Sequence, residues 1–464
     1  MKKKQVFTVT DLGGGDGGKG GVVHKICVAK KAHTVIKAGG AQGSHGVKTS
    51  AGQRFNFSQF GCGTFEGVKT YLSSLIVIEP LRLLAEAEEL QFEWGIGNVW
   101  SYLTVDDEAL CATPFHTIAS RLRELARKDN PKGTIGVGIG EAKLDSEIHP
   151  ELAIYAKDLN QSSLRDKLWA VREQKLLELE EIIENSATLW TVDQEMAQRE
   201  IDLIQDEDFV DWVADQFRLV ASRVKIVDRD FLVNEILSPD GVVVVESSHG
   251  VLTDKFYGFH PNTSRLRTIP QTIWNFLHDL GYDGEVVRLG VTRAYQIRHG
   301  AGAMVTEDQS FVEELLPGSS KDENRWQGKV RVGPLDLVAL RYAIEVCGGP
   351  QVFHGLAISW FDQIKLLGRW PMCDRYLGAD DPNFFGPDGQ IKVSHQSGDE
   401  QLVRQAELSR QLSLCRPEIT SFDLKGFADE RELAGLCSET LLKALGVPVR
   451  MISFGPTEAD KVLL

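Results

Sequence analysis

The densest group of chemistry-bearing residues is the stretch Asp11–Gly21, in which seven glycines crowd around Asp16 and Lys19. Glycine has no Cβ, so successive backbone N–H groups can turn toward a single point. Such a nest, opening onto the start of a helix, binds phosphate, and Lys19 would add a positive charge for phosphate oxygens. An anion is repelled there unless it has a task. Asp16 suits two tasks: holding Mg²⁺, or taking a proton from a substrate.

This stretch matches only part of the generic P-loop pattern, G-x-x-x-x-G-K-[ST]. Gly13 to Lys19 fit its first seven positions, but Gly20 stands where the pattern has a Mg²⁺-binding hydroxyl. An ordinary P-loop ATPase is therefore a poor fit. A glycine-rich turn without chemical meaning is the alternative, and the order strand, glycines, Lys, helix favours a phosphate site over it.

Two further glycine-rich loops follow along the chain. The first, Gly39–Gly46, contains His45, and the glycines around it leave this imidazole little core to fill. A charged imidazole there would suit the bridge between the β- and γ-phosphates of a nucleotide. The second loop, Lys132–Gly140, is weak evidence when taken alone.

Alternating strands and helices must position these loops. Strands are predicted over Val6–Thr10, Thr34–Ala38, Ser74–Ile78, Gly241–Glu246 and Val286–Gly290, and helices over Gly21–Ala29 and from Pro80 to about Leu90. Apolar residues at three- to five-residue steps predict a helical layer between about residues 162 and 224. The pattern predicts an α/β fold, with a mainly parallel central β-sheet flanked by helices and a site along one edge.

No internal repeat or Pro-rich linker divides the chain. We therefore expect one domain, 1–464, with a helical embellishment at about 150–225. The net charge of −15 disfavours a nucleic-acid partner. Seven scattered cysteines without a C-x-x-C pair argue against a zinc site and a disulfide framework. No stretch approaches the length of a membrane helix, so we expect a cytoplasmic protein without membrane contact.

Taken together, the loops resemble those of the adenylosuccinate synthetase family. Six family motifs have counterparts here in the family's order, spread over nearly the whole chain. W-G-D-E-G-K-G resembles Gly14–Gly20, G-G-x-N-A-G-H-T resembles Gly39–Gly46, T-T-G-R-G-I-G resembles Thr134–Gly140, E-G-A-Q-G resembles Glu246–Gly250, Y-S-T-R-V-G-A-G resembles Tyr295–Gly302, and S-T-G-P resembles Ser453–Pro456. Each match is weak to moderate, and their combination is specific.

The resemblance implies a ligase reaction. The γ-phosphate of a nucleoside triphosphate, ATP or GTP, moves onto the 6-oxygen of a purine nucleoside monophosphate, and the α-amine of L-aspartate then displaces phosphate. Asp16 would remove the N1 proton and hold Mg²⁺ together with the Ser44 carbonyl. His45 would stabilise the leaving diphosphate, and Lys19 would hold phosphates. A homodimer is also implied.

The same resemblance implies the remaining site residues. The nucleotide and its phosphates would contact Gly15, Gly17, Gly18, Gly20, Gln42, Gly43, Thr134, Gly136, His249, Thr263, Ser453, Gly455 and Pro456. The aspartate carboxylates would contact Arg298, Lys329 and Arg331. The Arg that the family supplies across its dimer has no evident counterpart in this chain.

The sequence also departs from the family. A T-K-L-D stretch reads guanine in the family with a carboxylate, and we align it with Leu356–Ser359, which lacks both Lys and Asp. ATP is therefore at least as suitable a donor as GTP. The aspartate-binding loop T-T-G-R-x-R-R-x-G-W is reduced to Gln327–Gly333. Gln42 replaces an Asn, His249 a Gln and Ile135 a hydroxyl residue.

Several departures resemble the phage branch of the family, which makes 2-aminoadenylosuccinate from dGMP. That branch also lacks T-K-L-D, has a T-S-R turn like Thr263–Arg265, and ends like Phe454–Thr457. It often carries a small hydroxyl residue where Asp16 stands, so the acceptor, IMP or (d)GMP, stays open. Two other functions also remain open. One is an enzyme on this scaffold that phosphorylates a nucleotide or uses another amine, and the other is a nucleotide sensor without turnover.

Overall fold

The structure, a computed structural model, describes residues 4–464 except 129, 187–193, 316–322, 325, 395 and 428. The chain forms two compact units. The first consists of the residues up to Ala32, His45–Asn56 and Asp240–Leu464, and the second of His33–Ser44 and Phe57–Pro239. Among the helices that the structure describes, none is both long enough and apolar enough to cross a lipid bilayer.

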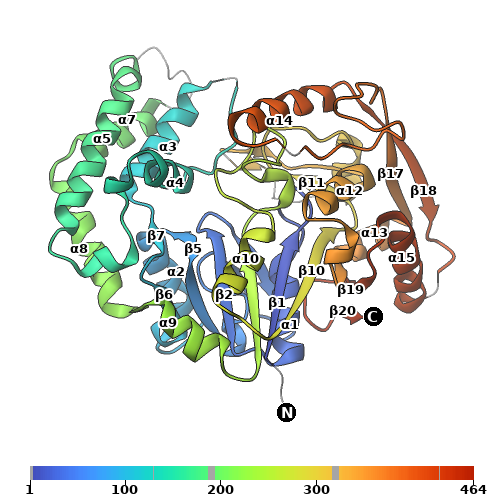
Figure 1. Ribbon diagram of the computed structural model, residues 1–464, viewed down its shortest axis with the longest axis horizontal. Helices are drawn as coiled ribbons and strands as arrows, with labels where there is room; N and C mark the ends of the chain where they lie inside the picture. Colours follow the sequence, from blue (N-terminus) through green and yellow to red (C-terminus); the bar gives the residue numbers. More distant parts are fainter. Residues whose placement is uncertain are drawn as a thin grey trace. The chain divides into compact units, whose positions relative to one another are not determined.

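The first unit contains a sheet in the order β20-β19-β16-β10-β1-β9, of which Figure 1 labels β20, β19, β10 and β1. Its strands are β1 (Gln5–Asp11), β9 (Val242–Ser247), β10 (Glu285–Arg293), β16 (Gly355–Ser359), β19 (Val449–Ser453) and β20 (Lys461–Leu463). All neighbours pair in parallel except β19 and β20. After its first residue β1 is entirely buried, as expected for a central parallel strand with both faces covered.

The five parallel strands of this unit all end in a polar residue. β1 ends at Asp11, β9 at Ser247, β10 at Arg293, β16 at Ser359 and β19 at Ser453. Carboxyl ends of parallel strands lie at one edge of a sheet, where ligands bind in open α/β folds. The topology therefore gathers these residues and the loops after them on one edge.

The other elements of the first unit surround this sheet. Helices are α1 (Lys19–Lys30), α10 (Gln271–Asp279), α11 (Gln309–Leu315), α12 (Leu337–Val346), α13 (Phe361–Leu367), α14 (Gly398–Leu412) and α15 (Glu430–Leu445). Smaller sheets join β15 (Leu335–Asp336), β17 (Arg369–Leu377) and β18 (Arg416–Asp423), and β11 (Gln296–Arg298) with β14 (Arg331–Gly333). A continuous apolar core includes edge-to-face contacts of Phe361 with Trp370 and Phe454.

The second unit contains a parallel sheet in the order β2-β5-β6-β8, with β7 also paired to β5. Its strands are β2 (Thr34–Gly40), β5 (Lys69–Ile78), β6 (Leu103–Asp106), β7 (Leu110–Cys111) and β8 (Lys225–Val227). Its helices are α2 (Pro80–Phe92), α3 (Pro114–Ala126), α4 (Ile139–Ile148), α5 (Leu164–Glu184), α7 (Gln194–Gln205), α8 (Asp208–Arg223) and the short α9 (Arg229–Phe231). The predicted fold class and the helical layer are confirmed.

Local sequence explains where two of these helices begin. Pro80 is the first residue of α2, and the Glu79 carboxylate caps it by accepting a hydrogen bond from the Arg82 amide. Pro114 opens α3 in the same way behind Thr113, whose hydroxyl faces the His116 amide. These signals are local in sequence, and the predicted start of α2 at Pro80 is correct.

Candidate functional site

The nest joins the end of β1 to the start of α1. Gly15 and Gly18 have left-handed backbones, and Asp16 adopts the same region with φ of 58°, which is uncommon for a residue with a side chain. At Gly20 a Cβ would lie 2.7 Å from the Gly46 carbonyl oxygen, so the first turn of α1 packs directly against the chain next to His45. The glycines thus allow backbone turns and close approaches that other residues would block.

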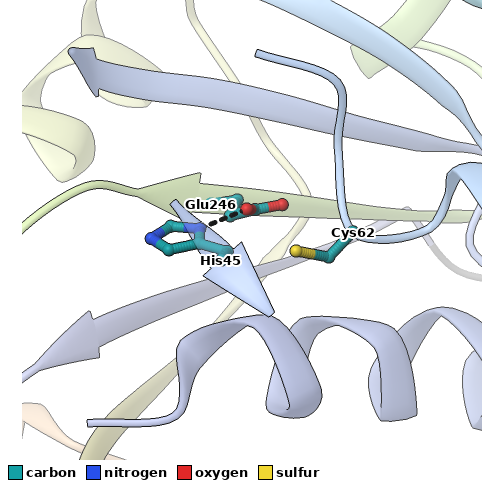
Figure 2. Close-up of side chains that lie close together, drawn as sticks. All are labelled: His45, Cys62 and Glu246. Atoms are coloured by element: carbon teal, nitrogen blue, oxygen red, sulfur yellow. Dashed lines mark hydrogen bonds and ion pairs between the residues drawn. The ribbon is translucent and has the colours of Figure 1, made fainter. Parts of the chain in front are cut away.

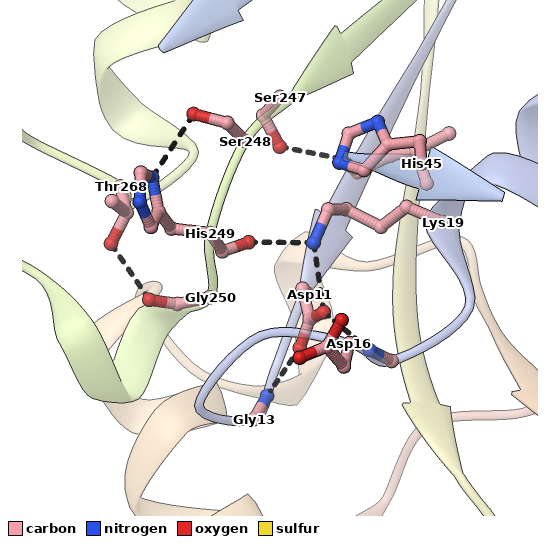
Figure 3. A network of polar contacts seen from close by, with 12 residues as sticks. Asp11, Gly13, Asp16, Lys19, His45, Ser247, Ser248, His249, Gly250 and Thr268 are labelled. Atoms are coloured by element: carbon pink, nitrogen blue, oxygen red, sulfur yellow. Dashed lines mark hydrogen bonds and ion pairs between the residues drawn. The ribbon is translucent and has the colours of Figure 1, made fainter. Parts of the chain in front are cut away.

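Asp11 organises this loop, a role that we did not assign from the sequence. Its carboxylate accepts hydrogen bonds from the amides of Gly13 and Gly17 and from Lys19 Nζ, each at 2.8 Å (Figure 3). Lys19 Nζ also donates to the His249 carbonyl at 2.7 Å. The ammonium is therefore held in a fixed place beside the nest. The sequence feature that could have indicated this role is an acidic residue at the last position of a strand that leads into a glycine-rich loop.

Asp16 lies at the accessible rim of the nest. Its side chain is 44 % exposed, and one carboxylate oxygen lies 3.5 Å from His299 Nε2. Its main-chain carbonyl accepts a hydrogen bond from Arg293 Nε. A carboxylate that is open to the surroundings while its backbone is tethered can reach a substrate proton or a cation without moving the loop.

His45 begins β3 (His45–Lys48), and its Nδ1 atom pairs with the Glu246 carboxylate near the end of β9 (Figure 2). Both side chains are buried, Glu246 completely. A carboxylate on one ring nitrogen fixes the orientation of an imidazole and stabilises its cationic form. This pair gives His45 the means to face developing negative charge. Glu246 belongs to a motif quoted above, but only the structure brings it to His45.

His249 follows β9 with a left-handed backbone, φ 60°. Its Nδ1 atom lies 3.1 Å from the hydroxyl oxygen of Ser248, within hydrogen-bond distance (Figure 3). Burial, and next the charge of Lys19, lower the pKa of His249 to about 4. The imidazole is therefore neutral at physiological pH, when it can accept one hydrogen bond and donate another, as the amide of a Gln would.

The end of β16 lies beside the nest, because Ser359 Oγ donates to the Gly17 carbonyl at 2.6 Å. We aligned the guanine-reading Lys and Asp with Ala357 and Ser359, but Ala357 lies inside the strand and is buried. The residues at the strand end are Ser359, Trp360, Phe361 and Asp362, and Asp362 stands in the first turn of α13. A carboxylate is therefore present at this edge, three residues beyond the position that we considered.

Trp360 occupies the turn between β16 and α13 with a left-handed backbone, φ 61°. The Arg293 guanidinium lies over its indole ring, 4.3 Å from the centroid. The same guanidinium donates a hydrogen bond to the Asp16 carbonyl, so Arg293 links the Trp360 ring to the nest.

The predicted residues Ser453, Gly455 and Pro456 lie at the end of β19 and in the loop that joins it to β20. The buried Ser453 hydroxyl has no hydrogen-bond partner in the part of the chain that the structure describes. Lys461 Nζ donates to the carbonyls of Pro456 at 3.2 Å and Thr457 at 2.7 Å, and burial lowers the pKa of this lysine to about 8. A buried hydroxyl without a partner is costly, which favours a ligand polar group there.

The predicted aspartate-binding residues differ in availability. Arg298 is buried and donates to the carbonyls of Ala301 at 3.0 Å and Asn262 at 2.9 Å, and burial lowers its pKa to about 10. Arg331 lies opposite it in the β11–β14 pair. Lys329 is exposed in β13 (Gly328–Lys329). The Arg298 side chain is thus largely occupied by backbone groups.

Arg331 donates to Glu307 at 2.7 Å and to the Gly302 carbonyl at 2.7 Å. It is half-buried, as is Thr263, whose hydroxyl lies 3.4 Å from His260 Nε2. Arg331 is therefore the best-placed cation of the predicted aspartate set, although an acid already neutralises part of its charge.

The second unit carries the other predicted nucleotide contacts. Gln42, Gly43 and Ser44 follow the end of β2, in a turn closed by a bond from the Gly43 amide to the Gly40 carbonyl at 3.0 Å. Thr134 and Gly136 lie in the loop before α4.

Helix α3 fixes this loop. The Glu124 carboxylate accepts the amides of Gly133 at 2.6 Å and Thr134 at 3.4 Å, and Arg121 Nε donates to the Gly136 carbonyl at 3.1 Å. One helix therefore sets the conformation of a loop that carries two predicted contacts.

Comparison with known proteins gives one consistent result. The family model described as adenylosuccinate synthetase matches residues 9–462. The adenylosuccinate synthetase of Caldicellulosiruptor saccharolyticus is 26 % identical over 81 % of this chain and 82 % of its own length. That of Fusobacterium nucleatum is 23 % identical over 98 % of both chains.

Two solved structures share the fold. A fully ligated adenylosuccinate synthetase from Plasmodium falciparum superposes with a TM-score of 0.74 at 16 % identity, covering 99 % of both chains. Cyanophage S-2L succinoaminodeoxyadenylate synthetase, bound to dGMP and to dATP as energy donor, gives a TM-score of 0.57 at 14 % identity, covering 99 % of this chain and 95 % of the other.

Proposed function

The chain belongs to the adenylosuccinate synthetase family, and we propose that it joins L-aspartate to the 6-position of a 6-oxopurine nucleoside monophosphate, IMP or (d)GMP. Members of this family are ligases that form a C–N bond at the expense of a nucleoside triphosphate. In the proposed reaction a 6-phosphoryl nucleotide is the intermediate, and the products are a succinyl-amino purine nucleotide, a nucleoside diphosphate and phosphate.

One observation carries the proposal. A tethered but accessible carboxylate, Asp16, a fixed ammonium, Lys19, and a carboxylate-paired imidazole, His45, all occur in the first unit next to the carboxyl ends of β1 and β9. The contacts suit these roles: Arg293 holds only the backbone of Asp16, Asp11 fixes the Lys19 ammonium, and Glu246 stabilises the His45 cation. These are the three functions that phosphorylation of a purine 6-oxygen requires: a base, a phosphate clamp and stabilisation of the leaving group.

The proposed reaction has two chemical steps. Asp16 accepts the N1 proton, and the electron pair moves to the 6-oxygen, which forms a bond to the γ-phosphorus. The bond from that phosphorus to the β–γ bridging oxygen breaks, and the cation of His45 faces the diphosphate that leaves. Next the α-amine of aspartate forms a bond to C6 and gives up one proton to the solvent, and the C6–oxygen bond breaks to release phosphate. Lys19 and the nest amides hold phosphate oxygens throughout.

The donor set also fits Mg²⁺. Mg²⁺ prefers oxygen ligands and is often held by one or two carboxylates together with substrate phosphates. Asp16 offers such a carboxylate at the accessible rim of the nest. When bound, Mg²⁺ would neutralise charge on the phosphates of the donor.

The donor base depends on the end of β16. Asp362 could accept hydrogen bonds from two N–H groups of guanine, whereas adenine lacks that paired donor edge. One possible pair of substrates is GTP as donor with IMP as acceptor. The cyanophage relative, which binds dATP as donor together with dGMP, supports a second pair, ATP as donor with dGMP as acceptor.

A second function is favoured by one observation. Arg298 is occupied by two backbone carbonyls, and Glu307 pairs with Arg331, so the cations available for an aspartate dicarboxylate are few. A related enzyme that phosphorylates the nucleotide or uses another amine is therefore the alternative. A nucleotide sensor without turnover would have no use for the Asp16, Lys19 and His45 set.

A substrate matrix tests the proposal. IMP, GMP, dGMP and dIMP are crossed with ATP and GTP, with and without aspartate, and diphosphate release and the succinyl-amino product are measured. We expect release to depend on one monophosphate and on aspartate. Asp16→Asn keeps the size of the side chain but cannot accept the proton, so turnover should fall by at least ~10²–10⁴-fold. Turnover of Asp16→Asn within threefold of wild type, or release without aspartate dependence, would overturn the proposal.

A further inference from the structure

The segment after β9 is anchored against the nest. The Leu252 amide donates to the Gly13 carbonyl at 3.0 Å, and a Cβ on Gly250 would lie 2.2 Å from that carbonyl oxygen. Only glycine permits this approach. Residues 250–269 therefore form a loop whose start is fixed relative to Asp16 and Lys19.

A completely buried carboxylate, Asp254, closes this loop. One oxygen accepts the amides of Phe256 at 2.9 Å and Tyr257 at 3.2 Å, and the other accepts those of Thr268 at 2.6 Å and Ile269 at 3.3 Å. One side chain thus ties the beginning of the loop to its end. A carboxylate can do this because both of its oxygens are acceptors.

Two backbone hydrogen bonds also join the two sides of this loop to each other. The Lys255 amide donates to the Leu266 carbonyl at 3.1 Å, and the Ser264 amide donates to the Thr253 carbonyl at 2.8 Å. The turn that these bonds present, 261–265, carries an amide, two hydroxyls and a guanidinium. It is a set of donors on a rigid support.

Arg265 in this turn differs from three other arginines of the first unit. Arg293 holds the Asp16 carbonyl, Arg298 holds two carbonyls, and Arg331 pairs with Glu307. Arg265 is half-buried, yet it forms no hydrogen bond or ion pair with any residue in the described ranges. A half-buried guanidinium without a protein partner keeps its planar set of donors available for an anion such as phosphate.

We propose that Arg265 binds the 5′-phosphate of the nucleoside monophosphate, and that Asp254 positions the turn for this contact. The inference rests on the proposed function for the identity of the ligand. A planar guanidinium bonds two phosphate oxygens at once, and the amide and hydroxyls of the turn can complete the site. The chain thereby supplies a phosphate-binding arginine of its own.

Arg267 in the same loop is a matched control. It lies two residues further on, but its Nε atom is 3.4 Å from Asp254 and its guanidinium stacks on the Phe256 ring. Arg265→Gln and Arg267→Gln therefore remove the same charge from the same loop, and only the first should remove the phosphate contact. Arg265→Lys keeps the charge without the planar fork.

The test is calorimetric binding of GMP, dGMP and IMP to the full chain, beside guanosine and inosine, which lack the phosphate. For the monophosphate that wild type binds, Arg265→Gln should weaken affinity about ten- to a hundredfold, and Arg265→Lys should weaken it less. Affinity for the nucleoside should change less than threefold. Arg267→Gln should stay within threefold for both ligands.

A second variant tests the role of Asp254. Asp254→Asn turns a donor NH₂ toward amides that also donate, so hydrogen exchange of peptides covering 254–269 should accelerate, and monophosphate affinity should fall at least tenfold. Glu86→Gln is its control, because the buried Glu86 likewise accepts the amides of Ser58, Gln59 and Phe60, outside this loop. It should leave both readouts unchanged.

The outcomes separate the two proposals. Wild-type affinity in Arg265→Gln, or equal loss for nucleoside and monophosphate, overturns the assignment of Arg265 and leaves the reaction standing. Faster exchange in Asp254→Asn with unchanged affinity overturns the positioning role. Monophosphate binding that depends on Arg265 in a wild type without aspartate-dependent turnover refutes the proposed reaction alone.

Discussion

At the scale of single residues, partners decide which charges are available. Lys19 and Asp11 are both nearly inaccessible and paired with each other, while the Asp16 side chain is 44 % exposed and lies 3.5 Å from His299 Nε2. Identical residue types thus take opposite roles within six positions. Asp11 shapes the loop, and the Asp16 carboxylate lies at its accessible rim.

His249 leads to a prediction about pH. Its folded pKa, about 4, lies below the ordinary value of 6.5, so the native state binds fewer protons than the unfolded state between these values. The contribution of neutral His249 to the free energy of unfolding is therefore fully present above pH 6.5 and is lost as the pH falls toward 4. At pH 4.5 the stability lost through this titration amounts to about 2.5 kcal/mol.

His249→Gln removes this titration while keeping a donor and an acceptor. We expect the melting temperature of the variant to rise relative to wild type as pH is lowered from 7.5 to 4.5. Melting curves of both proteins over this range check it. A difference that does not change with pH would show that His249 titrates normally.

Arg331 gives a prediction about the second substrate. A charge-assisted bond to a carboxylate that loses its water is worth roughly 1.5–3 kcal/mol, so Arg331→Leu should raise the aspartate KM at least tenfold. The KM values of both nucleotides should move less than threefold. Initial rates at varied aspartate concentration measure this.

The control for Arg331 is Glu307→Gln, which removes the carboxylate that accepts from it at 2.7 Å. If Arg331 serves the ligand, this change should leave the aspartate KM unchanged or lower it. Equal increases in the two variants would instead mean that the ion pair matters only for the local structure.

At the scale of elements, three loops that carry predicted ligand contacts are each held by one buried carboxylate. Asp11 accepts amides of the nest, Glu124 those of residues 133 and 134, and Asp254 those at both ends of residues 254–269. Loops rich in glycine and polar residues bury little apolar surface. A carboxylate that accepts several amides supplies the order that packing cannot.

Glu124 provides the corresponding prediction. Its other oxygen accepts from Arg127 at 2.7 Å, so Glu124→Gln should weaken one side of this arrangement. Since Thr134 and Gly136 are predicted nucleotide contacts, we expect the KM of one nucleotide to rise about five- to fiftyfold with kcat within threefold.

Steady-state kinetics with each nucleotide varied in turn checks this prediction. Arg127→Gln keeps the carboxylate and should leave the KM values within threefold. A fall in kcat without any change in KM for Glu124→Gln would place the loop in the chemical step and not in binding.

At the scale of the whole molecule, the chain passes between the two units four times, after Ala32, Ser44, Asn56 and Pro239. Neither unit is a continuous piece of sequence, so neither can be produced by one cut. We therefore propose that residues 1–464 behave as one domain in folding, and we expect a single cooperative thermal transition.

Calorimetry together with hydrogen exchange tests this proposal. Peptides from β1 and β10 in the first unit and from β5 and α3 in the second should lose protection at the same temperature. Independent domains would instead give two transitions several degrees apart. Peptides from one unit would then lose protection in the first transition and peptides from the other unit in the second.

The sequence by itself determined the features that depend on neighbours along the chain. The strand into the nest, the glycine loop, the helix that begins at Pro80 and the helices after residue 162 are all set by local preferences and by apolar periodicity. The motifs that identify the family are likewise short and ordered along the chain, so they are readable without coordinates.

The tertiary structure alone decided which distant residues meet. Glu246 pairs with His45 across about 200 positions, Lys19 reaches the carbonyl of His249, and Ser359 at the end of β16 reaches the carbonyl of Gly17. Likewise, it is the fold that leaves Arg298 hydrogen-bonded to backbone carbonyls and Arg265 without a partner among the described residues. Pairing of this kind depends on strand order and on the path of loops. Both are set by packing of the whole chain, because hydrogen-bond partners are chosen by proximity in space and not by residue type.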